Sequence, residues 1–527
     1  MAMDLPKDPV SLFQLFCPVS LVEEWVGWTN SNVALLLTKE LPPKPLASWQ
    51  QTTVAEVYIW LAILIYIGIH KEKRVSDYWI TPKPGELKLV HPVTKWMTYP
   101  RFQQLFQFLR ISPPSESNTT RSVERTISQV SRWSEHIQAV SSDLFVPGKH
   151  IAIDKCVIRF KAGSRKLGPK GIKAWVVAQE GYFVRWKFDI PDSRPRKQGI
   201  LARTQTNKHR LAKTQAAVLD LILQLPITSY RVFFDDLFTT PQLLRALRDH
   251  GVVSTGAARL NGGIDPPFAL VKSQDSRGQV QWKIDGPRAD DQANPAAWKD
   301  NALVLFLNSF LDGSNTQETQ RRRSSSTKAR AQQEPGLFGT ASEMVMQMPS
   351  IAVCYNERMN AVDRGDQLRL HLGYKHSVHH DSGQAIAWTF IFDTVLVNTY
   401  ILQQKKEYNW KSYKEQTSWR EAIAVGLIKQ FNSDGATRRR FSTGDEFTPF
   451  AEHHHVKSTK YSSCVGCQRR QVGVIPTRNS ARAPPGEVYQ SSSKTRARQT
   501  NYRCDKCNVA LCTHQDCWYF YHLPICT

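Results

Sequence analysis

The sequence predicts a multidomain α/β protein, and three observations support this class. The chain has 527 residues, which is enough for three or four domains with a large core. Apolar residues recur at helical spacing in its first part, whereas a period of two with β-branched residues begins near Lys149. Seven of its ten cysteines fall between Cys464 and Cys526. We therefore expect a helical region, a mixed α/β core and a small cysteine-rich domain.

The helical region is expected over residues 1–147. Its apolar segments are 21–28, 54–69 and 102–109, and proline-rich stretches separate them. Segment 54–69 is the most apolar, but it is short for a membrane span and contains Glu56. It is therefore predicted to be a buried helix, and no membrane partner is expected.

The core is expected to begin at residue 148. Its pattern is three antiparallel strands, a helix, a strand that ends in acids, a helix and a strand, which is typical of a mixed α/β domain. A polar run of low complexity at about 314–335 predicts a disordered loop in an otherwise irregular insertion. The expected domains are a helical one in two parts (1–147 and 373–450, which ends in a linker), a core in two parts (148–256 and 348–372), an insertion (257–347) and a cysteine-rich domain (451–527).

Asp154, Asp235 and Asp363 are candidates for one shared site. Asp154 lies within an apolar strand, where a carboxylate costs free energy unless a cation pairs with it. Asp235 closes another strand, and Asp363 begins a helix with Asp366 one turn beyond it on the same face. Converging carboxylates need a cation, and their oxygen ligands suit Mg²⁺ or Mn²⁺. Taken singly, each acid could instead be a turn or helix-cap residue.

Two such ions can stabilise both oxygens of an in-line phosphoryl displacement, so the acids predict cleavage of a phosphodiester. The net charge of +23 also indicates a polyanionic partner. Nucleic acid is the first choice and an anionic membrane surface the second. Basic tails on an otherwise ordinary protein are the alternative explanation of the charge.

The terminal cysteine cluster predicts two tetrahedral Zn²⁺ ions. Two Cys-x₂-Cys pairs with nearby Cys and His favour zinc over disulfides, because nothing in the sequence indicates secretion. Metal would also supply the folding free energy that so small a tail lacks. One of His453, His454 or His455 could add a ligand, whereas Cys526 is expected to be a bystander. The candidate ligands are Cys464, Cys467, Cys504, Cys507, Cys512, His514, Cys517 and His522.

The segments around the three acids resemble the piggyBac transposase family. They are Phe234-Asp-Asp-Leu-Phe-Thr-Thr-Pro241, Ala361-Val-Asp-Arg-Gly-Asp-Gln-Leu368, and Asp154 followed by Lys170-Gly-Ile-Lys-Ala-Trp175. The resemblance covers about residues 10–523, and Val-Asp-x-x-Asp-Gln is its most specific part. It implies an RNase H-like (retroviral integrase-type) core with an inserted domain, a flanking helical dimerisation and DNA-binding domain, and a C-terminal cross-brace zinc finger.

The resemblance also implies a DDD-type DNA transposase that cuts double-stranded DNA at element ends and joins them to TTAA targets. Asp154, Asp235 and Asp363 would then be the catalytic acids, with Asp366 as an accompanying fourth. Asp236 stands where the family usually has Asn. A homodimer that acts in the nucleus on transposon ends and target DNA is the corresponding expectation. For the cysteine-rich tail, binding of DNA ends competes with reading of a chromatin peptide.

The residues around Asp154 depart from the family. Lys155 stands where Glu is common, and Ala162-Gly163 replaces a Gly-Arg pair. Because side chains alternate along a strand, Lys155 is expected to point to the face opposite Asp154. These departures leave open a catalytically inactive descendant that binds DNA or chromatin. A zinc-finger regulator unrelated to transposons would leave the acidic motifs unexplained.

Overall fold

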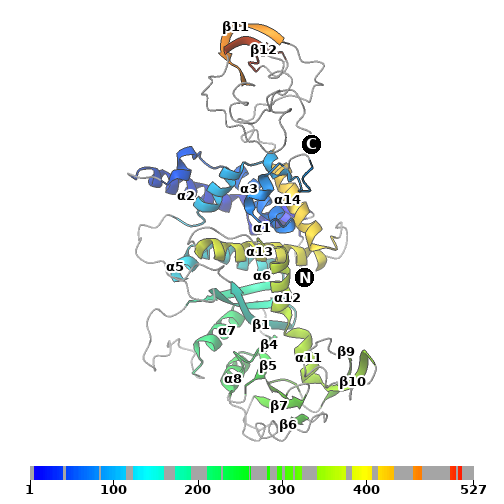
Figure 1. Cartoon of the computed structure of the whole chain (residues 1–527). Helices are drawn as coiled ribbons and strands as arrows, with labels where there is room; N and C mark the ends of the chain where they lie inside the picture. The colour runs from blue at the N-terminus through cyan, green and yellow to red at the C-terminus, as the bar shows by residue number, and fades with distance from the viewer. Residues whose placement is uncertain are drawn as a thin grey trace. The chain divides into compact units, whose positions relative to one another are not determined.

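The structure is a computed structural model of the chain, and its described residues fall into two compact units, Met1–Ser433 and Asp434–Thr527 (Figure 1). The described residues are 5–6, 8–39, 43–81, 85–113, 123–158, 172–190, 210–226, 229–259, 262, 282–284, 293–299, 303–311, 315–322, 341–374, 383–405, 413–432, 455–465, 499–505 and 509–512.

An eight-stranded mixed sheet forms the centre of the first unit, in the order β3-β2-β1-β4-β5-β8-β7-β6. Strands β1, β4 and β5 are parallel, whereas β2 and β3 on one side and β8, β7 and β6 on the other pair antiparallel. This sheet confirms the predicted mixed α/β class. The bounds are β1 His150–Ile158, β2 Ile172–Gln179, β3 Tyr182–Asp189, β4 Arg231–Phe234, β5 Val253–Ala258, β6 Trp282–Ile284, β7 Asn294–Lys299 and β8 Leu303–Asn308.

Strands β2 and β3 form a tight hairpin. The two turn residues, Glu180 and Gly181, have positive φ angles of 52° and 96°. A two-residue turn of this kind matches the right-handed twist of the strands that it joins. The turn therefore holds Gly181 in one position, and helix α12 (Ala361–His371) packs against it there.

Helices cover the strands β1 to β3, whose residues are mostly buried. In Figure 1, α6, α12 and α13 lie on one side of these strands and α7 lies on the other. Helix α11 contacts β1 and β5, and α8 contacts β5. The bounds are α6 Ser131–Leu144, α7 Lys213–Leu223, α8 Pro241–Asp249, α11 Ser350–Arg358, α12 Ala361–His371 and α13 Gly383–Lys405.

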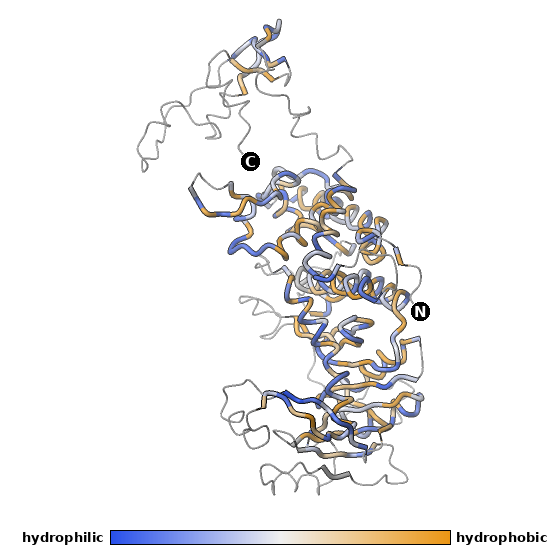
Figure 2. The backbone as a smooth tube through the Cα atoms, turned by 90° about the vertical axis from the view of Figure 1, so that its right-hand side faces the viewer, coloured by the Kyte–Doolittle hydropathy of each residue, from blue (hydrophilic) through white to orange (hydrophobic). Residues whose placement is uncertain are grey.

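A group of helices from the two ends of this unit packs around α3. Helix α3 is apolar after Glu56 in its first turn, and it contacts α14, which lies more than 340 residues later in the chain. Figure 2 shows hydrophobic residues running through these helices. No helix among the described residues is long and apolar enough to cross a membrane. The bounds are α1 Pro9–Phe16, α2 Val19–Leu37, α3 Val54–Ile69, α4 Tyr99–Phe108, α5 Val123–Ser128 and α14 Gln416–Asn432, with short 3₁₀ turns at Lys44–Ser48, Val75–Trp79 and Pro92–Lys95.

The expectation of an irregular, partly disordered insertion is wrong for several segments. Strands β7 and β8 continue the central sheet, and β9 (Thr316–Arg322) pairs antiparallel with β10 (Glu343–Pro349). The polar strand β9 forms because its backbone groups bond to a partner strand more than 20 residues away, which local composition does not reveal. The rest of the predicted loop, 323–335, lies outside the described residues.

Candidate active site

Asp154 lies on β1, and Asp235 directly follows the neighbouring parallel strand β4 at the same level. Ile153 of β1 pairs with Phe234 of β4, so the next residue on each strand is an aspartate. Neighbouring strands are about 4.8 Å apart, which brings the two carboxylates to one point of the sheet. Strand β4 ends at Phe234 while β1 continues to Ile158, so this edge of β1 is uncovered beside Asp154.

Asp363 lies in the first turn of α12, which contacts β1, β2 and β3. The mutual influence of the acids appears in the pKa of Asp154, which is raised to about 6. Burial is the main cause, and the negative charges of Asp235 and Asp363 add to it, against the backbone N–H and the charge of Lys155. The structure thus brings Asp154 and Asp235 together, and it places Asp363 near enough for its charge to act on Asp154.

Gly365 sets the distance between α12 and the β2–β3 hairpin. A Cβ atom at this position would lie 2.5 Å from the backbone oxygen of Gly181 and 2.7 Å from the ring of Phe183. Only glycine permits this approach without displacing backbone. Gly365 lies between Asp363 and Asp366 in the chain, so the contact also fixes where both acids sit.

Asp366 is held by neighbours of its own. Its Oδ1 accepts hydrogen bonds from Nη2 and Nε of Arg369 at 2.6 and 3.0 Å, and from Sγ of Cys156 at 3.5 Å. Arg369 is almost fully buried, and its position one helical turn from Asp366 is the sequence signal that would have identified it. Asp366 thus anchors α12 to β1, two residues along the strand from Asp154.

The prediction that Lys155 points away from the acids is wrong. Its Nζ lies 3.2 Å from Oδ2 of Asp235. The side chain is 45% exposed, and it can bend around the end of β4 because that strand stops at Phe234. A long lysine stem is not confined to the face that strand alternation gives its Cβ atom.

Other residues that the sequence did not identify also surround the acids. Arg259 binds Asp236 through two hydrogen bonds of 2.9 and 3.1 Å, so Asp236 is turned toward β5. Tyr355 of α11 is partly buried, and burial raises the pKa of its hydroxyl, with a further rise from Asp235 and Asp154. Nothing in the sequence pattern marks Tyr355, because its proximity arises only from the packing of α11.

The acids fit a divalent metal ion by their chemistry, although protein cations engage two of them in this arrangement. Their oxygen donors have suitable chemistry for Mg²⁺. However, Asp235 forms an ion pair with Lys155, and Asp366 forms one with Arg369. Within the described ranges, no group of three His, Cys, Asp or Glu side chains is arranged to hold a metal. Asp154 and Asp363 form no ion pair with any residue that the structure describes.

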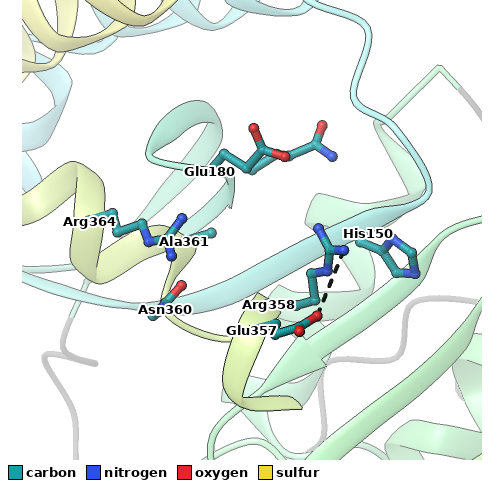
Figure 3. A pocket seen from close by; sticks show the side chains of 8 residues that line it. His150, Glu180, Glu357, Arg358, Asn360, Ala361 and Arg364 are labelled. Carbon is teal, nitrogen blue, oxygen red and sulfur yellow. Dashed lines mark ion pairs between the residues drawn. The ribbon is translucent and has the colours of Figure 1, made fainter. Parts of the chain in front are cut away.

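A cavity of about 280 Å³ lies beside the start of α12. Figure 3 shows Arg358 and Arg364 projecting from the two helix segments on either side of Asn360. His150 lies beside Arg358, which forms an ion pair with Glu357, and Glu180 lies across from Asn360. Glu180 binds Lys405 at 2.6 Å, and the charges of Arg358 and Arg364 also contribute to its lowered pKa. The lining of this cavity thus sets two arginines, Arg358 and Arg364, against two glutamates, Glu180 and Glu357, and Arg364 follows Asp363 directly in the chain.

A second cavity of about 320 Å³ adjoins the first, and its lining carries more arginines than glutamates. It shares Asn360 and Arg364 with the first cavity and adds Arg321 and Arg322 of β9. The predicted disordered run thus contributes two arginines to an ordered strand beside the first turn of α12. Together, the two cavities form a groove in which four arginines face two glutamates. We call it the basic groove and define it as the surface lined by His150, Glu180, Arg321, Arg322, Glu357, Arg358, Asn360 and Arg364.

In the second unit, strands β11 (His455–Ser463) and β12 (Gln499–Cys504) pair antiparallel. Cys464, Cys504 and Cys512 are buried in one cluster with Leu511, and the backbone N–H of Cys512 donates to Sγ of Cys464 at 3.2 Å. His455 occupies the register position opposite Cys504. The other predicted ligands and histidines, Cys467, Cys507, His514, Cys517, His522, His453 and His454, lie outside the described residues.

Comparison with known proteins gives consistent matches. The family model for Transposase IS4 matches residues 8–400. PiggyBac transposable element-derived protein 2 from Homo sapiens is 22% identical over 479 residues, which cover 87% of this chain and 72% of that protein. PiggyBac transposable element-derived protein 3 from Homo sapiens is 23% identical over 301 residues, which cover 56% of this chain and 41% of that protein.

The fold is also found among solved structures. The chain aligns with a piggyBac transposase from the cryo-EM structure of its synaptic complex with hairpin DNA, with a TM-score of 0.59 and 15% identity over 93% of this chain and 88% of the other. The likeness at this identity concerns the fold. Because the family model matches most of the chain, this protein belongs to the Transposase IS4 family and is of the piggyBac type.

Proposed function

We propose that the chain is a DNA transposase of the cut-and-paste type, a DDD-type enzyme acting at TTAA targets. The observation that carries the proposal is the register of β1 and β4, which sets Asp154 beside Asp235. Asp363 approaches the pair from α12, and its charge contributes to the raised pKa of Asp154. The antiparallel β1–β3 meander followed by parallel β4 and β5, with helices on both sides, supports an RNase H-like core.

The basic groove is the proposed path for a DNA strand. It begins at Arg364, next to the candidate catalytic Asp363, and runs to Arg321 and Arg322. Arginines in such a groove neutralise phosphates and release condensed counterions, which supplies most non-specific DNA affinity. The net charge of +23 supports the same partner. A homodimer that acts in the nucleus on element ends and target DNA completes the proposal.

Mg²⁺ or Mn²⁺ at Asp154, Asp235 and Asp363 is the proposed cofactor, and when bound it would activate the attacking oxygen. The chain's own residues prepare the site. Asp154 is ionised above its pKa of about 6 and so offers a charged oxygen at neutral pH. Arg369 and Cys156 hold Asp366, and Gly365 holds α12 against the hairpin.

An excision assay tests the proposed function. The substrate is a reporter gene flanked by the terminal repeats that bracket the coding sequence in its genome. We expect the wild-type chain to restore the reporter and to leave TTAA at the repaired junction. A wild-type chain that binds these repeats but never excises them would contradict the proposal.

That contrary result would favour the second candidate, a catalytically inactive transposase relative that binds DNA or chromatin. The specific observation in its favour is the ion pair between Lys155 and Asp235, which engages a carboxylate that cleavage needs. The candidate retains the basic groove and predicts DNA affinity with a strong dependence on salt.

We also propose that the second unit binds two Zn²⁺ ions, which is supported by the clustering of Cys464, Cys504 and Cys512. Elemental analysis of the full chain is expected to give two zinc ions. Cys464→Ser should lower that number and loosen the β11–β12 pair, because metal supplies the folding free energy of so small a unit. Cys354→Ser in α11 is the matched control and should retain all the zinc. Equal zinc in both variants would contradict the assignment of Cys464.

A further inference from the structure

The acids around the candidate active site are largely neutralised by the protein's own cations. The ammonium group of Lys155 lies 3.2 Å from Asp235. Three of the five aspartates in this region have such a partner, namely Asp235 with Lys155, Asp236 with Arg259 and Asp366 with Arg369. Of these partners, only Lys155 binds an acid that belongs to the proposed catalytic set of Asp154, Asp235 and Asp363.

We propose that Lys155 is a built-in counter-cation that competes with a divalent metal ion for Asp235. In the resting protein its ammonium group holds the position of the metal, and metal binds when the lysine side chain leaves. The inference rests on the proposed function only in taking Asp154, Asp235 and Asp363 as one site. It concerns the occupancy of that site and requires no DNA.

Residue 155 contacts both of the strand acids at once. Its backbone N–H donates to Oδ1 of Asp154 at 2.7 Å, and its ammonium group donates to Oδ2 of Asp235 at 3.2 Å. A metal ion that bridges two carboxylates would need oxygens from these same two groups. The contacts of residue 155 thus cover the region in which such an ion would sit.

The contact is suited to exchange with a metal ion. The Lys155 side chain is 45% exposed and that of Asp235 is 21% exposed, so water screens the pair. Exposed ion pairs are weak, and a lysine stem can rotate into solvent without disturbing the fold. By contrast, Arg369 is 6% exposed beside Asp366, so that pair is fixed within the packing of α12.

The position of Lys155 explains why exchange is possible at this acid. Strand β4 ends at Phe234, and β1 beyond Ile153 pairs with β2 on its other side. The lysine therefore crosses an open edge of the sheet to reach Asp235. No described strand must move when the side chain swings away from this edge.

Titration of Mn²⁺ into the purified full chain, followed by electron paramagnetic resonance, tests the inference. Lys155→Gln removes the positive charge, and Lys155→Glu adds a carboxylate. We expect Mn²⁺ affinity to rise at least about tenfold with Lys155→Gln, because an ammonium charge a few ångströms from the metal is lost. The rise should be larger with Lys155→Glu.

Lys187→Gln is the matched control. Lys187 binds Asp220 at 2.8 Å, and both side chains are 50% exposed, so it removes one exposed lysine–aspartate pair elsewhere on the surface. Its Mn²⁺ affinity should equal that of the wild type. Mn²⁺ affinity that is equal in wild type and Lys155→Gln, or binding that is absent from both, overturns the inference.

A second readout follows the lysine itself. Brief acetylation and mass spectrometry should show that Mn²⁺ increases the labelling of Lys155 and leaves that of Lys187 unchanged. Labelling of Lys155 that is insensitive to a saturating concentration of Mn²⁺ would contradict displacement. Both readouts are made without DNA, so a chain that binds Mn²⁺ as expected but does not excise DNA retains the inference and loses the proposed function.

Discussion

Replacing Asp363 by alanine is expected to reduce DNA strand cleavage by about 10²–10³-fold, the cost of removing one preorganised charged group from a reacting centre. Asp363 is exposed in the first turn of α12, and its charge contributes to the raised pKa of Asp154. Its loss should therefore remove a carboxylate from the site without a packing defect. DNA binding should stay close to that of the wild type, because the basic groove remains.

Asp220→Ala is the matched control for this variant. Asp220 is an exposed aspartate on helix α7, where it binds Lys187. Its loss should leave both cleavage and DNA binding unchanged. Cleavage by Asp363→Ala at the rate of the control would show that this acid has no part in the reaction, whereas loss of DNA binding together with cleavage would point to a folding defect.

Replacing Gly365 by alanine is expected to lower the free energy of unfolding by about 1–3 kcal/mol, the usual cost of an overpacked contact. The added methyl group would meet the backbone oxygen of Gly181 at 2.5 Å and the ring of Phe183 at 2.7 Å. Since the backbone oxygen cannot rotate away, α12 must shift, and Asp363 and Asp366 shift with it. The rate of DNA strand cleavage should therefore fall by more than the smaller fraction of folded protein accounts for.

Gly27→Ala in helix α2 is the matched control, because it makes the same substitution within a helix without a clash. No atom lies within 4 Å of a Cβ at Gly27. Alanine is favoured over glycine within a helix by roughly 1 kcal/mol, so this control should be as stable as the wild type or more stable. Denaturant unfolding of both variants checks the prediction, and a Gly365→Ala protein as stable as Gly27→Ala would contradict it.

Much of the core was predictable because its signals are local. The period of two around Asp154 and the helical spacing before Asp235 follow from which side chains are buried along one element. The acids at the ends of elements, together with the family resemblance, identified Asp363 as the third member. These expectations need no knowledge of strand order, and the structure agrees with them in the placement of β1, β4 and α12.

The features that the sequence did not predict depend on pairing between distant segments. Strand β9 exists because β10 lies beside it, although its own residues are polar. The contact of Lys155 with Asp235 depends on where β4 ends relative to β1, and no rule of alternation within β1 contains that information. Tyr355 approaches the acids only through the packing of α11. The approaches of Lys155 and Tyr355 to the candidate site thus both arise where distant segments pack together.

The central claim is that Asp154, Asp235 and Asp363 act as one site, and strand cleavage of an element end by single and double variants tests it most directly. Each of Asp154→Asn, Asp235→Asn and Asp363→Asn should lose cleavage to a similar degree. Residues that act as a unit are strongly non-additive, so the double variant of Asp154 and Asp235 should be no worse than either single one. Wild-type cleavage by any single variant, or losses that multiply in the double variant, would contradict the claim.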